Sequence, residues 1–332
     1  MLPGIHPLSL QSRPITTNIK ANILEAIGNT PLIELTDLSP DPDVRIFAKY
    51  EAANPTGSIK DRVAKSLVLD GERKGLLKPG GTILEPTSGN TGLGLAMIAS
   101  VRGYRMIAVM PESVSKERVD LLRAYGAEIA FSDPDKGTNE SIILAKKLAD
   151  ENPSYYMPYQ YGNEANPQTH VETTGPEILR DLPDVDIFIA GLGTGGTLMG
   201  IGRFLKAHNP NVKVVATAPH PDDKVQGLRS IEHGFIPPIL DLDLLDARIL
   251  IEAEEAFYWT RKLLTDAGVF VGVSSGATFA TAHKIAERMS RNGESGKIVV
   301  TFADGGWKYL STGIYSQSYK FSQKEIEGKT WW

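Results

Sequence analysis

The sequence predicts an α/β protein with two lobes, each with a mostly parallel twisted sheet covered by helices, and a cleft between the lobes. Strand-like and helix-like runs alternate from residue 82, which is the pattern of parallel sheets buried on both faces. The alternation starts again after Asn152-Pro153. The chain has 332 residues, which is long for a single core. A cleft between two such lobes is a common place for a small-molecule site.

The N-terminal half is predicted to begin with a loose arm over residues 1–20, which contain no apolar core. A helical turn over residues 23–27 stops at Gly28, because glycine and the following Asn-Thr-Pro favour a turn. The predicted strands of this half span residues 33–35, 44–50, 82–85, 104–110 and 127–131. Its predicted helices span residues 61–74, 92–102, 116–125 and 139–151.

The C-terminal half shows the same architecture without any repeat of sequence. Its predicted helices span residues 169–181, 196–208, 254–267 and 277–291, and its predicted strands span residues 187–192, 212–218, 249–251 and 298–302. We expect a smaller lobe over residues 52–160, with a mobile part from about 105 to 151. We expect a larger lobe over residues 21–51 and 161–320, followed by a tail over residues 321–332.

The composition excludes several classes of function. The net charge of −5 argues against nucleic acid and an anionic membrane as partners. The chain has no cysteine, which excludes disulfides, thiolate nucleophiles and cysteine metal sites, and its six histidines lack metal-ligand spacing, so no metal is expected. No apolar run approaches the roughly 20 residues that span a bilayer, so we expect a cytoplasmic protein.

Four loops lie where predicted strands lead into helices, which is where open α/β sheets bind ligands. The first loop, residues 54–62, sets Lys60 behind an Asn-Pro-Thr-Gly turn at the start of a helix. The positive end of a helix disfavours a charged ammonium, and a neutral amine can form a Schiff base with a carbonyl. Taken alone, a solvated lysine beside a helix cap explains the same string.

The second loop is Thr87-Ser88-Gly89-Asn90-Thr91-Gly92, which combines small hydroxyl residues with glycines. Backbone amides exposed at a helix start make a seat for an anion such as a carboxylate. A helix capped by serine or asparagine is the alternative. The Gly-x-Ser-x-Gly pattern of a hydrolase nucleophile is absent from this loop.

The third loop is Gly191-Leu192-Gly193-Thr194-Gly195-Gly196-Thr197, whose amides and hydroxyls can wrap a phosphate. The string also fits Gly-x-Gly-x-x-Gly, so a nicotinamide-dependent dehydrogenase is the alternative. A dinucleotide site needs an acidic residue at the end of the next strand. That strand ends in Ala218-Pro219-His220, and the first acids, Asp222 and Asp223, come later. A single phosphate therefore fits better than a dinucleotide.

The fourth loop, residues 272–277, places Ser274 and Ser275 where a predicted helix opens. Either serine can be a plain helix cap. A serine aimed into the cleft can instead hydrogen-bond a neutral heteroaromatic nitrogen. An amine nucleophile, a phosphate cradle, a carboxylate seat and a serine for a ring nitrogen together describe pyridoxal phosphate that holds an amino acid.

In these four loops the chain resembles the cysteine synthase / cystathionine β-synthase family of fold-type II pyridoxal phosphate enzymes. The resemblance extends from about Asn22 to the C-terminus, and it implies a tryptophan synthase β-like fold. The most specific strings are residues 54–62 and 87–92. The resemblance implies that Lys60 carries pyridoxal 5′-phosphate as an internal aldimine and, once displaced, takes the α-proton as a general base. It implies further cofactor contacts from Asn90, Gly193, Thr194, Gly195, Gly196, Thr197 and Ser274. It implies substrate contacts from Thr87, Ser88, Gly89, Thr91 and Gln160, and a structural role for His170.

The chemistry of these residues agrees with β-replacement. A serine does not hold the pyridine protonated as a carboxylate would, so the ring is a weaker electron sink. Loss of a β leaving group needs less carbanion stabilisation than transamination or racemisation. We therefore expect β-elimination to an aminoacrylate, followed by addition of a sulfur nucleophile.

Arg229 is informative about the identity of the substrate, because it occupies a position where many O-acetylserine enzymes have a short uncharged loop. Around Arg229, in residues 305–312 and at the end of the chain, the sequence is most similar to actinobacterial O-phosphoserine sulfhydrylases. These enzymes take sulfur from a thiocarboxylated carrier protein. The resemblance implies that Arg229 holds the substrate phosphate, as its planar fork suits, and that the tail shields the aminoacrylate. A solvated arginine, and an oligomer contact through Trp331-Trp332, are the alternatives.

The expected activity is therefore that of a cysteine synthase that uses O-phosphoserine, with sulfur from a thiocarboxylated carrier protein or sulfide. An O-acetylserine sulfhydrylase that uses sulfide is the second hypothesis, and cystathionine β-synthase is the third. A binding protein that kept the fold but lost catalysis would lack Lys60 or Asn90, and both are present. The resemblance also implies a homodimer.

Overall fold

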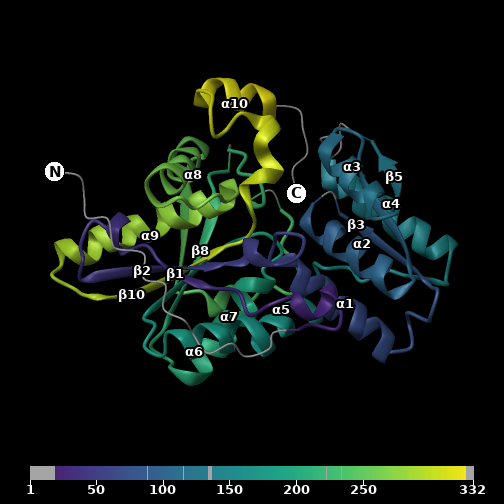
Figure 1. Ribbon diagram of the computed structural model, residues 1–332, viewed down its shortest axis with the longest axis horizontal. Coiled ribbons are helices and arrows are strands. Elements are labelled where there is room, and N and C mark those ends of the chain that lie inside the picture. Colours follow the sequence, from purple (N-terminus) through teal and green to yellow (C-terminus); the bar gives the residue numbers. More distant parts are fainter. Residues whose placement is uncertain are drawn as a thin grey trace.

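The strands of the chain form two separate sheets, which lie side by side with α1 near their junction (Figure 1). The computed structural model describes residues 19–87, 89–114, 116–133, 137–221, 223–232 and 234–326. Most of the predicted N-terminal arm, Ser88 and the Trp331-Trp332 tail lie outside the described residues.

The larger sheet has six strands in the order β1-β2-β10-β7-β8-β9. Its strands are β1 (Leu32–Glu34), β2 (Val44–Tyr50), β7 (Ile187–Gly191), β8 (Lys213–Pro219), β9 (Ala247–Ile251) and β10 (Gly296–Phe302). Only β1 runs antiparallel to its neighbour among these pairs. Strand β10 is last in the chain but lies between β2 and β7, and its residues pair with β2 along the full length of both strands. The carboxyl ends of β2 and β10 therefore lie next to each other.

Helices cover both faces of this sheet (Figure 1). On one face lie α8 (Ala253–Ala267) and α9 (Val273–Arg291). On the other face lie α5 (Ala165–Thr169), a π-helical turn (His170–Thr174), α6 (Gly175–Asp181) and α7 (Gly196–His208). The last described helix, α10 (Tyr319–Ile326), packs its Tyr319 ring edge-on against Phe257 of α8. Each face has its own apolar core of fully buried side chains.

The smaller sheet has four parallel strands in the order β5-β4-β3-β6. They are β3 (Thr82–Pro86), β4 (Arg105–Pro111), β5 (Glu128–Ser132) and β6 (Tyr155–Tyr156). Helix α4 (Gly137–Glu151) packs against one face, and α2 (Asn90–Arg102) and α3 (Lys116–Ala124) pack against the other. We call the larger sheet with its covering helices the larger body, and the smaller sheet with its helices the smaller body. Helix α1 (Lys60–Arg73) contacts α2 of the smaller body on one side and α5 of the larger body on the other.

These two sheets confirm the predicted α/β architecture of parallel strands covered on both faces. The limits of the two lobes as folding units stay a prediction. Among the described residues, no helix is both long and apolar enough to cross a membrane.

Two helix predictions were wrong in detail. The region predicted as a helix over residues 169–181 is helical throughout, but the helical run begins at Ala165 and contains a π-helical turn that ends at Thr174, shortly before Pro176, whose missing N–H interrupts the regular ladder. Helix α9 begins at Val273, four residues before its predicted start. Gly276 indicated a turn, but it lies inside the helix, where a Cβ would come within 2.1 Å of the Thr260 hydroxyl of α8. Glycine is needed there because the two helices are in close contact.

A buried ion network fixes α1 to the larger sheet. The Arg62 guanidinium donates to Glu51, directly after β2, at 2.8 and 3.0 Å, and to Glu177 of α6 at 2.6 and 2.7 Å. Lys49 of β2 forms an ion pair with Glu177 at 2.8 Å and donates to the Thr30 carbonyl at 2.6 Å. Burial disfavours the Glu177 carboxylate, but hydrogen bonds and charge from Arg62 and Lys49 lower its pKa to about 2. Glu177 therefore remains ionised at neutral pH.

We expect Arg62→Met to lower the free energy of unfolding by about 3–5 kcal/mol, because the carboxylates of Glu51 and Glu177 lose their partner while buried. Arg45→Met, which breaks the exposed pair with Glu34, is the matched control and should cost at most about 1 kcal/mol. Urea unfolding followed by circular dichroism measures both. Equal losses in the two variants would contradict the role given to the network.

Candidate active site

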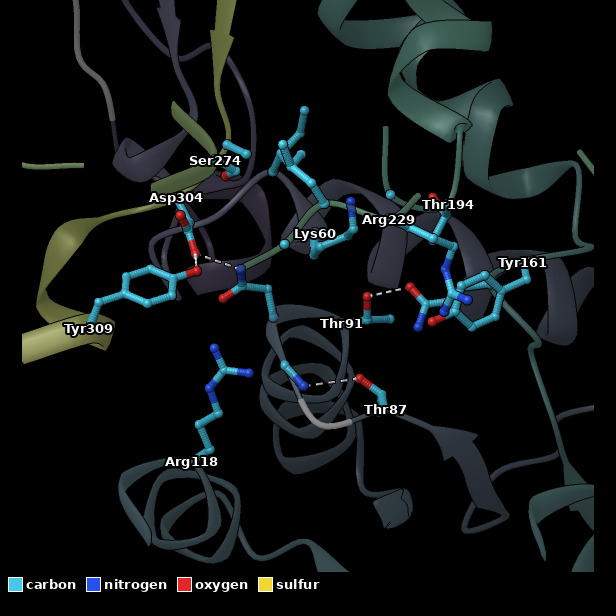
Figure 2. Close-up of a pocket in the computed structure, with 18 residues that line it drawn as sticks. Lys60, Thr87, Thr91, Arg118, Tyr161, Thr194, Arg229, Ser274, Asp304 and Tyr309 are labelled. Carbon is cyan, nitrogen blue, oxygen red and sulfur yellow. Dashed lines mark hydrogen bonds between the residues drawn. The ribbon is translucent and has the colours of Figure 1, made fainter. Parts of the chain in front are cut away.

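One cavity brings together residues of α1 and of loops that follow strands of both sheets (Figure 2). Ten of the predicted site residues line it: Lys60, Thr87, Gly89, Asn90, Thr91, Gln160, Gly193, Thr194, Arg229 and Ser274. An adjoining cavity shares Lys60, Thr194 and Ser274 with the first and is also lined by Gly195 and Thr197. Four loops that are far apart in the sequence therefore meet, as their positions at strand ends predicted.

Lys60 is the first residue of α1, and the turn before it is fixed to the end of β10. The Ile59 amide donates to the Ala303 carbonyl at 2.9 Å, and Ser58 forms an isolated bridge with Asp304. Burial lowers the pKa of the Lys60 amine to about 8, although the charges of Asp304 and Glu51 act to raise it. The sequence predicted this direction from the helix terminus, but desolvation is the larger cause. Within the described part of the chain, no carboxylate forms an ion pair with the amine, which leaves it available to a carbonyl ligand.

The predicted carboxylate seat is built around the start of α2. The Thr87 hydroxyl accepts hydrogen bonds from the Gly92 amide at 3.1 Å and the Gly89 amide at 3.4 Å, and Thr87 also lines the cavity. The residue before the helix is Gly89, which has no side chain to cap it, so the alternative of a cap by Asn90 is wrong. The Thr91 hydroxyl donates to Gln160 Oε1 at 2.7 Å, which leaves the Gln160 amide nitrogen free to donate elsewhere. Ser88 lies outside the described residues.

Glu85, at the end of β3, holds the loop that carries Gln160. Its carboxylate accepts the backbone amides of Tyr159 at 2.8 Å and Gln160 at 3.0 Å. Tyr159 has a left-handed backbone with φ of 54°, which costs energy for a residue with a side chain. Burial raises the pKa of Glu85 to about 7, although the two amides oppose this shift. The carboxyl group was not predicted, and it determines where Gln160 and the following Tyr161 lie.

The third loop turns into the first residues of α7. Gly195 has φ of 89°, which only glycine adopts without strain. At Gly196 a Cβ would come within 2.0 Å of Asn166 Oδ1, so the loop lies directly on α5. The Asn166 side-chain amide donates to the Thr194 hydroxyl at 3.0 Å, which fixes the loop from behind. The amides of such a loop at the start of a thirteen-residue helix can bind a phosphate.

His170 supports this loop from behind and does not line either cavity. Its Nε2 lies 3.4 Å from the Thr197 hydroxyl and its Nδ1 lies 2.9 Å from the Thr174 hydroxyl. Burial, with the charges of Lys60 and Arg62, holds the pKa of the imidazole well below its usual value. The residue is therefore neutral, which suits the structural role that the sequence predicted.

Ser274 lies in the first turn of α9 and faces the cavity (Figure 2). The helix is preceded by Gly272, and no side chain caps it, so the alternative of a serine cap is wrong. A Cβ at Gly227 would lie 3.5 Å from the Ser274 hydroxyl, which places that hydroxyl beside the 225–231 loop.

Arg229 lies at the edge of the same cavity, opposite the start of α2 (Figure 2). Its guanidinium carbon lies 5.4 Å from the Tyr161 ring centre and 4.8 Å from the Phe235 ring centre, so two aromatic faces hold it. Its Nη2 is buried and has no hydrogen-bond partner among the described residues. An unpaired buried donor is costly, and an anionic ligand would satisfy it.

The residues that the sequence analysis missed in the cavity wall or its surroundings include four with polar side chains that bear on the site: Lys308, Asp304, Tyr309 and Arg118. Asp304 Oδ2 accepts from Asn90 Nδ2 at 2.8 Å and from the Tyr309 hydroxyl at 2.6 Å (Figure 2). Asp304 follows β10 and precedes two glycines. It therefore stands at the end of a strand, as the four predicted loops do, and the same rule could have identified it as a site residue. Arg118 lies in the first turn of α3, and no local pattern marks it.

The cavity fits a polar, anionic ligand. Three buried polar atoms have no partner among the described residues: Arg229 Nη2 and Asp304 Oδ1 belong to residues that line it, and Thr301 Oγ1 to a residue that lines the adjoining cavity. In the described part of the chain no cluster of histidine, aspartate and glutamate could hold a metal ion. Together with the amine of Lys60 and the loop at α7, these atoms suit a phosphorylated carbonyl compound beside an amino acid.

Comparison with known proteins gives concordant results. A family model described as "Pyridoxal-phosphate dependent enzyme" matches residues 23–304. The chain is 43% identical over 310 residues to a probable cysteine synthase of Bacillus subtilis, covering 90% of this chain and 98% of that protein. It resembles the crystal structure of O-acetyl serine sulfhydrylase isoform 3 from Entamoeba histolytica, with a TM-score of 0.86, 33% identity and coverage of 97% and 99% of the two chains. It also resembles the structure of an O-ureido-L-serine synthase, with a TM-score of 0.84, 39% identity and coverage of 91% and 98%.

The carboxyl of Glu85 should make stability depend on pH. Folding raises its pKa from 4.5 to about 7, so its stabilising contribution is complete below pH 4.5 and is lost as the pH rises through 7. We expect wild type to lose on the order of 3 kcal/mol of unfolding free energy relative to Glu85→Gln across this interval. Urea unfolding of both proteins at several pH values measures the difference. Parallel profiles for the two proteins would show that Glu85 does not titrate in this way.

Proposed function

Because the chain belongs to the family of pyridoxal-phosphate dependent enzymes, we propose that it is a cysteine synthase that exchanges the phosphate of O-phosphoserine for sulfur. The similarity to cysteine synthases supports the reaction, and pyridoxal 5′-phosphate is the cofactor of this family. The observation that carries the choice of substrate is the unpaired Nη2 of Arg229 in the same cavity as Lys60.

The cofactor would be held by residues from each part of the cavity. Lys60 would hold its carbonyl carbon, and the loop of Gly193 to Thr197 its phosphate. Asn90 would contact the ring oxygen, and the Ser274 hydroxyl the ring nitrogen. When bound, pyridoxal phosphate supplies an electron sink next to the Cα of an amino acid.

Lys60 Nζ would then take the α-proton, because substrate binding releases it from the cofactor and it stays at the cavity wall. Its pKa of about 8 lies close to neutral pH, where a general base is most effective. The substrate carboxylate would be oriented by the seat at the start of α2 and by the Gln160 amide, whose oxygen is already occupied by Thr91. Glu85 would keep Gln160 in place.

Arg229 would hold the leaving group. Its guanidinium lies beside the rings of Tyr161 and Phe235, which hold it at the cavity, and a phosphate suits the fork geometry of its N–H groups. In the net reaction the Cβ–O bond breaks and phosphate leaves with the bonding electrons. A Cβ–S bond then forms from sulfide or from the thiocarboxylate of a carrier protein, and the α-proton returns from Lys60. With the carrier protein, the product stays joined to it as a thioester until water cleaves the acyl C–S bond, which regenerates the carrier carboxylate and releases cysteine.

Two other activities remain to be distinguished by substrate. An O-acetylserine sulfhydrylase that uses sulfide is favoured by the solved structure with that name. A cystathionine β-synthase would accept homocysteine in place of the sulfur donor.

We also propose that the segment from about 105 to 151, which carries Arg118 toward the cavity, closes over the substrate. We further propose that the protein is a homodimer.

Lys60→Ala should abolish the visible absorption band that forms when the purified protein is mixed with pyridoxal phosphate. In wild type the rate at which the band forms should rise with pH through about 8, because only the neutral amine attacks the carbonyl. Stopped-flow absorption measures the rate, and Lys65→Ala, also on α1, is the control. A colourless wild-type protein would refute the assignment, and so would a band of normal intensity in Lys60→Ala.

Arg229→Ala should lower kcat/KM for O-phosphoserine by about 10- to 150-fold, the equivalent of a lost charge-assisted hydrogen bond of about 1.5–3 kcal/mol. The value for O-acetylserine should change by less than about threefold, because acetate carries no charge in the ester. Steady-state assays with sulfide on both esters measure this ratio. Arg203→Ala on the exposed surface of α7 is the control. Equal losses on both esters would contradict a phosphate contact.

A further inference from the structure

Lys308 is a buried lysine that contacts one of the proposed cofactor residues. It lies in the 3₁₀ turn Gly306–Thr312, directly after β10 and its following loop, and is 9% exposed. Its ammonium donates to Asn90 Oδ1 and to the Gly57 carbonyl, the latter at 3.2 Å. One side chain from the larger body therefore links the turn before Lys60 to the first residue of α2.

The two neighbours of Asn90 determine which way its carboxamide points. An ammonium has only donors, so Lys308 must face the oxygen of the amide. An ionised carboxylate has only acceptors, so Asp304 must face the nitrogen, and Asn90 Nδ2 donates to Asp304 Oδ2 at 2.8 Å. The Tyr309 hydroxyl donates to the same carboxylate oxygen at 2.6 Å and fixes it in turn. The orientation of the Asn90 amide thus follows from the chemistry of its partners.

This arrangement leaves one N–H of Asn90 uncommitted. A carboxamide nitrogen has two hydrogens, and Asp304 accepts one of them. Asn90 lines the main cavity, together with Lys60 and Ser274. The second hydrogen is therefore available to an acceptor on a ligand in that cavity, while the Asn90 oxygen already accepts from Lys308.

We propose that Lys308 and Asp304 are positioning residues that lock the Asn90 carboxamide as a hydrogen-bond donor to the ring oxygen of bound pyridoxal phosphate. The proposal rests on the proposed function, since it assumes that this cofactor occupies the cavity. Burial lowers the pKa of Lys308 to about 8, opposed by the charges of Asp304 and Asp61, so the ammonium is mostly charged at neutral pH. Among the described residues, the buried Lys308 ammonium donates to the Asn90 amide oxygen and forms no ion pair with a carboxylate, which agrees with a role in orienting the Asn90 side chain.

The test uses the dissociation constant of pyridoxal phosphate for the full-length apoprotein, measured by titration of the visible band. Lys308→Met should raise this constant about tenfold, because the Asn90 oxygen loses its partner and the amide is no longer held. A second readout is spectral: a larger share of the bound cofactor should absorb in the near ultraviolet, because a ring oxygen without its N–H donor retains a proton. Lys284→Met, which removes an exposed lysine of α9, is the control and should change neither value.

A double-mutant cycle separates positioning from a general effect on the fold. In an Asn90→Ala background, Lys308→Met should change the dissociation constant less than about twofold, because its effect passes through Asn90. A full tenfold effect in that background overturns the proposal, and so does a Lys308→Met protein with wild-type affinity and spectrum. Thermal unfolding of each apoprotein confirms that the variants are folded. If wild type binds no pyridoxal phosphate, the proposed function fails as well; if wild type binds and the cycle shows no coupling, only the role of Lys308 fails.

Discussion

The buried contact of Arg62 with Glu51 and Glu177 is the constraint on which the arrangement of the site depends. Arg62 lies two residues after Lys60, and its partners lie at the end of β2 and in α6 of the larger body. Helix α1 packs on α2 of the smaller body, but its first turn is bound to the larger one. The amine therefore keeps its position relative to the loop at α7 and to Ser274. The hydrogen bonds of Lys308 with Asn90 and with the Gly57 carbonyl join the start of α2 to the turn before the amine.

Much of the fold and most of the candidate site could be predicted from local patterns. The bounds of β2 and α7 agree with their prediction, because each is a clear run between strong turn signals. The four loops meet at one cavity because parallel strands place their carboxyl ends at one edge. Strand β6 has only two residues and gives no periodic signal, and Gly276 indicated a turn although its role is helix packing.

The contacts that orient the site residues could not be predicted in this way. The bonds of Asn90 with Asp304 and Lys308 join residues more than 200 positions apart, so no spacing in the sequence marks them. The lowered pKa of Lys60 was predicted in direction, but its main cause is burial, which is a property of the assembled structure. Glu85 and Arg118 likewise depend on where the 159–161 loop and α3 come to lie.

The central place of β10 has a consequence for how the chain folds. This strand lies between β2 and β7 but is made after nearly 300 residues of the chain. The smaller sheet, with all its strands between residues 82 and 156, can form early during synthesis. The larger sheet keeps an open edge on β2 and on β7 until β10 arrives, and contacts of such long sequence separation form slowly. The nascent chain thus exposes the free edge of β2 from residue 50 onward, and that of β7 from residue 191 onward, until β10 is made, and each unpaired strand edge is a hazard for aggregation.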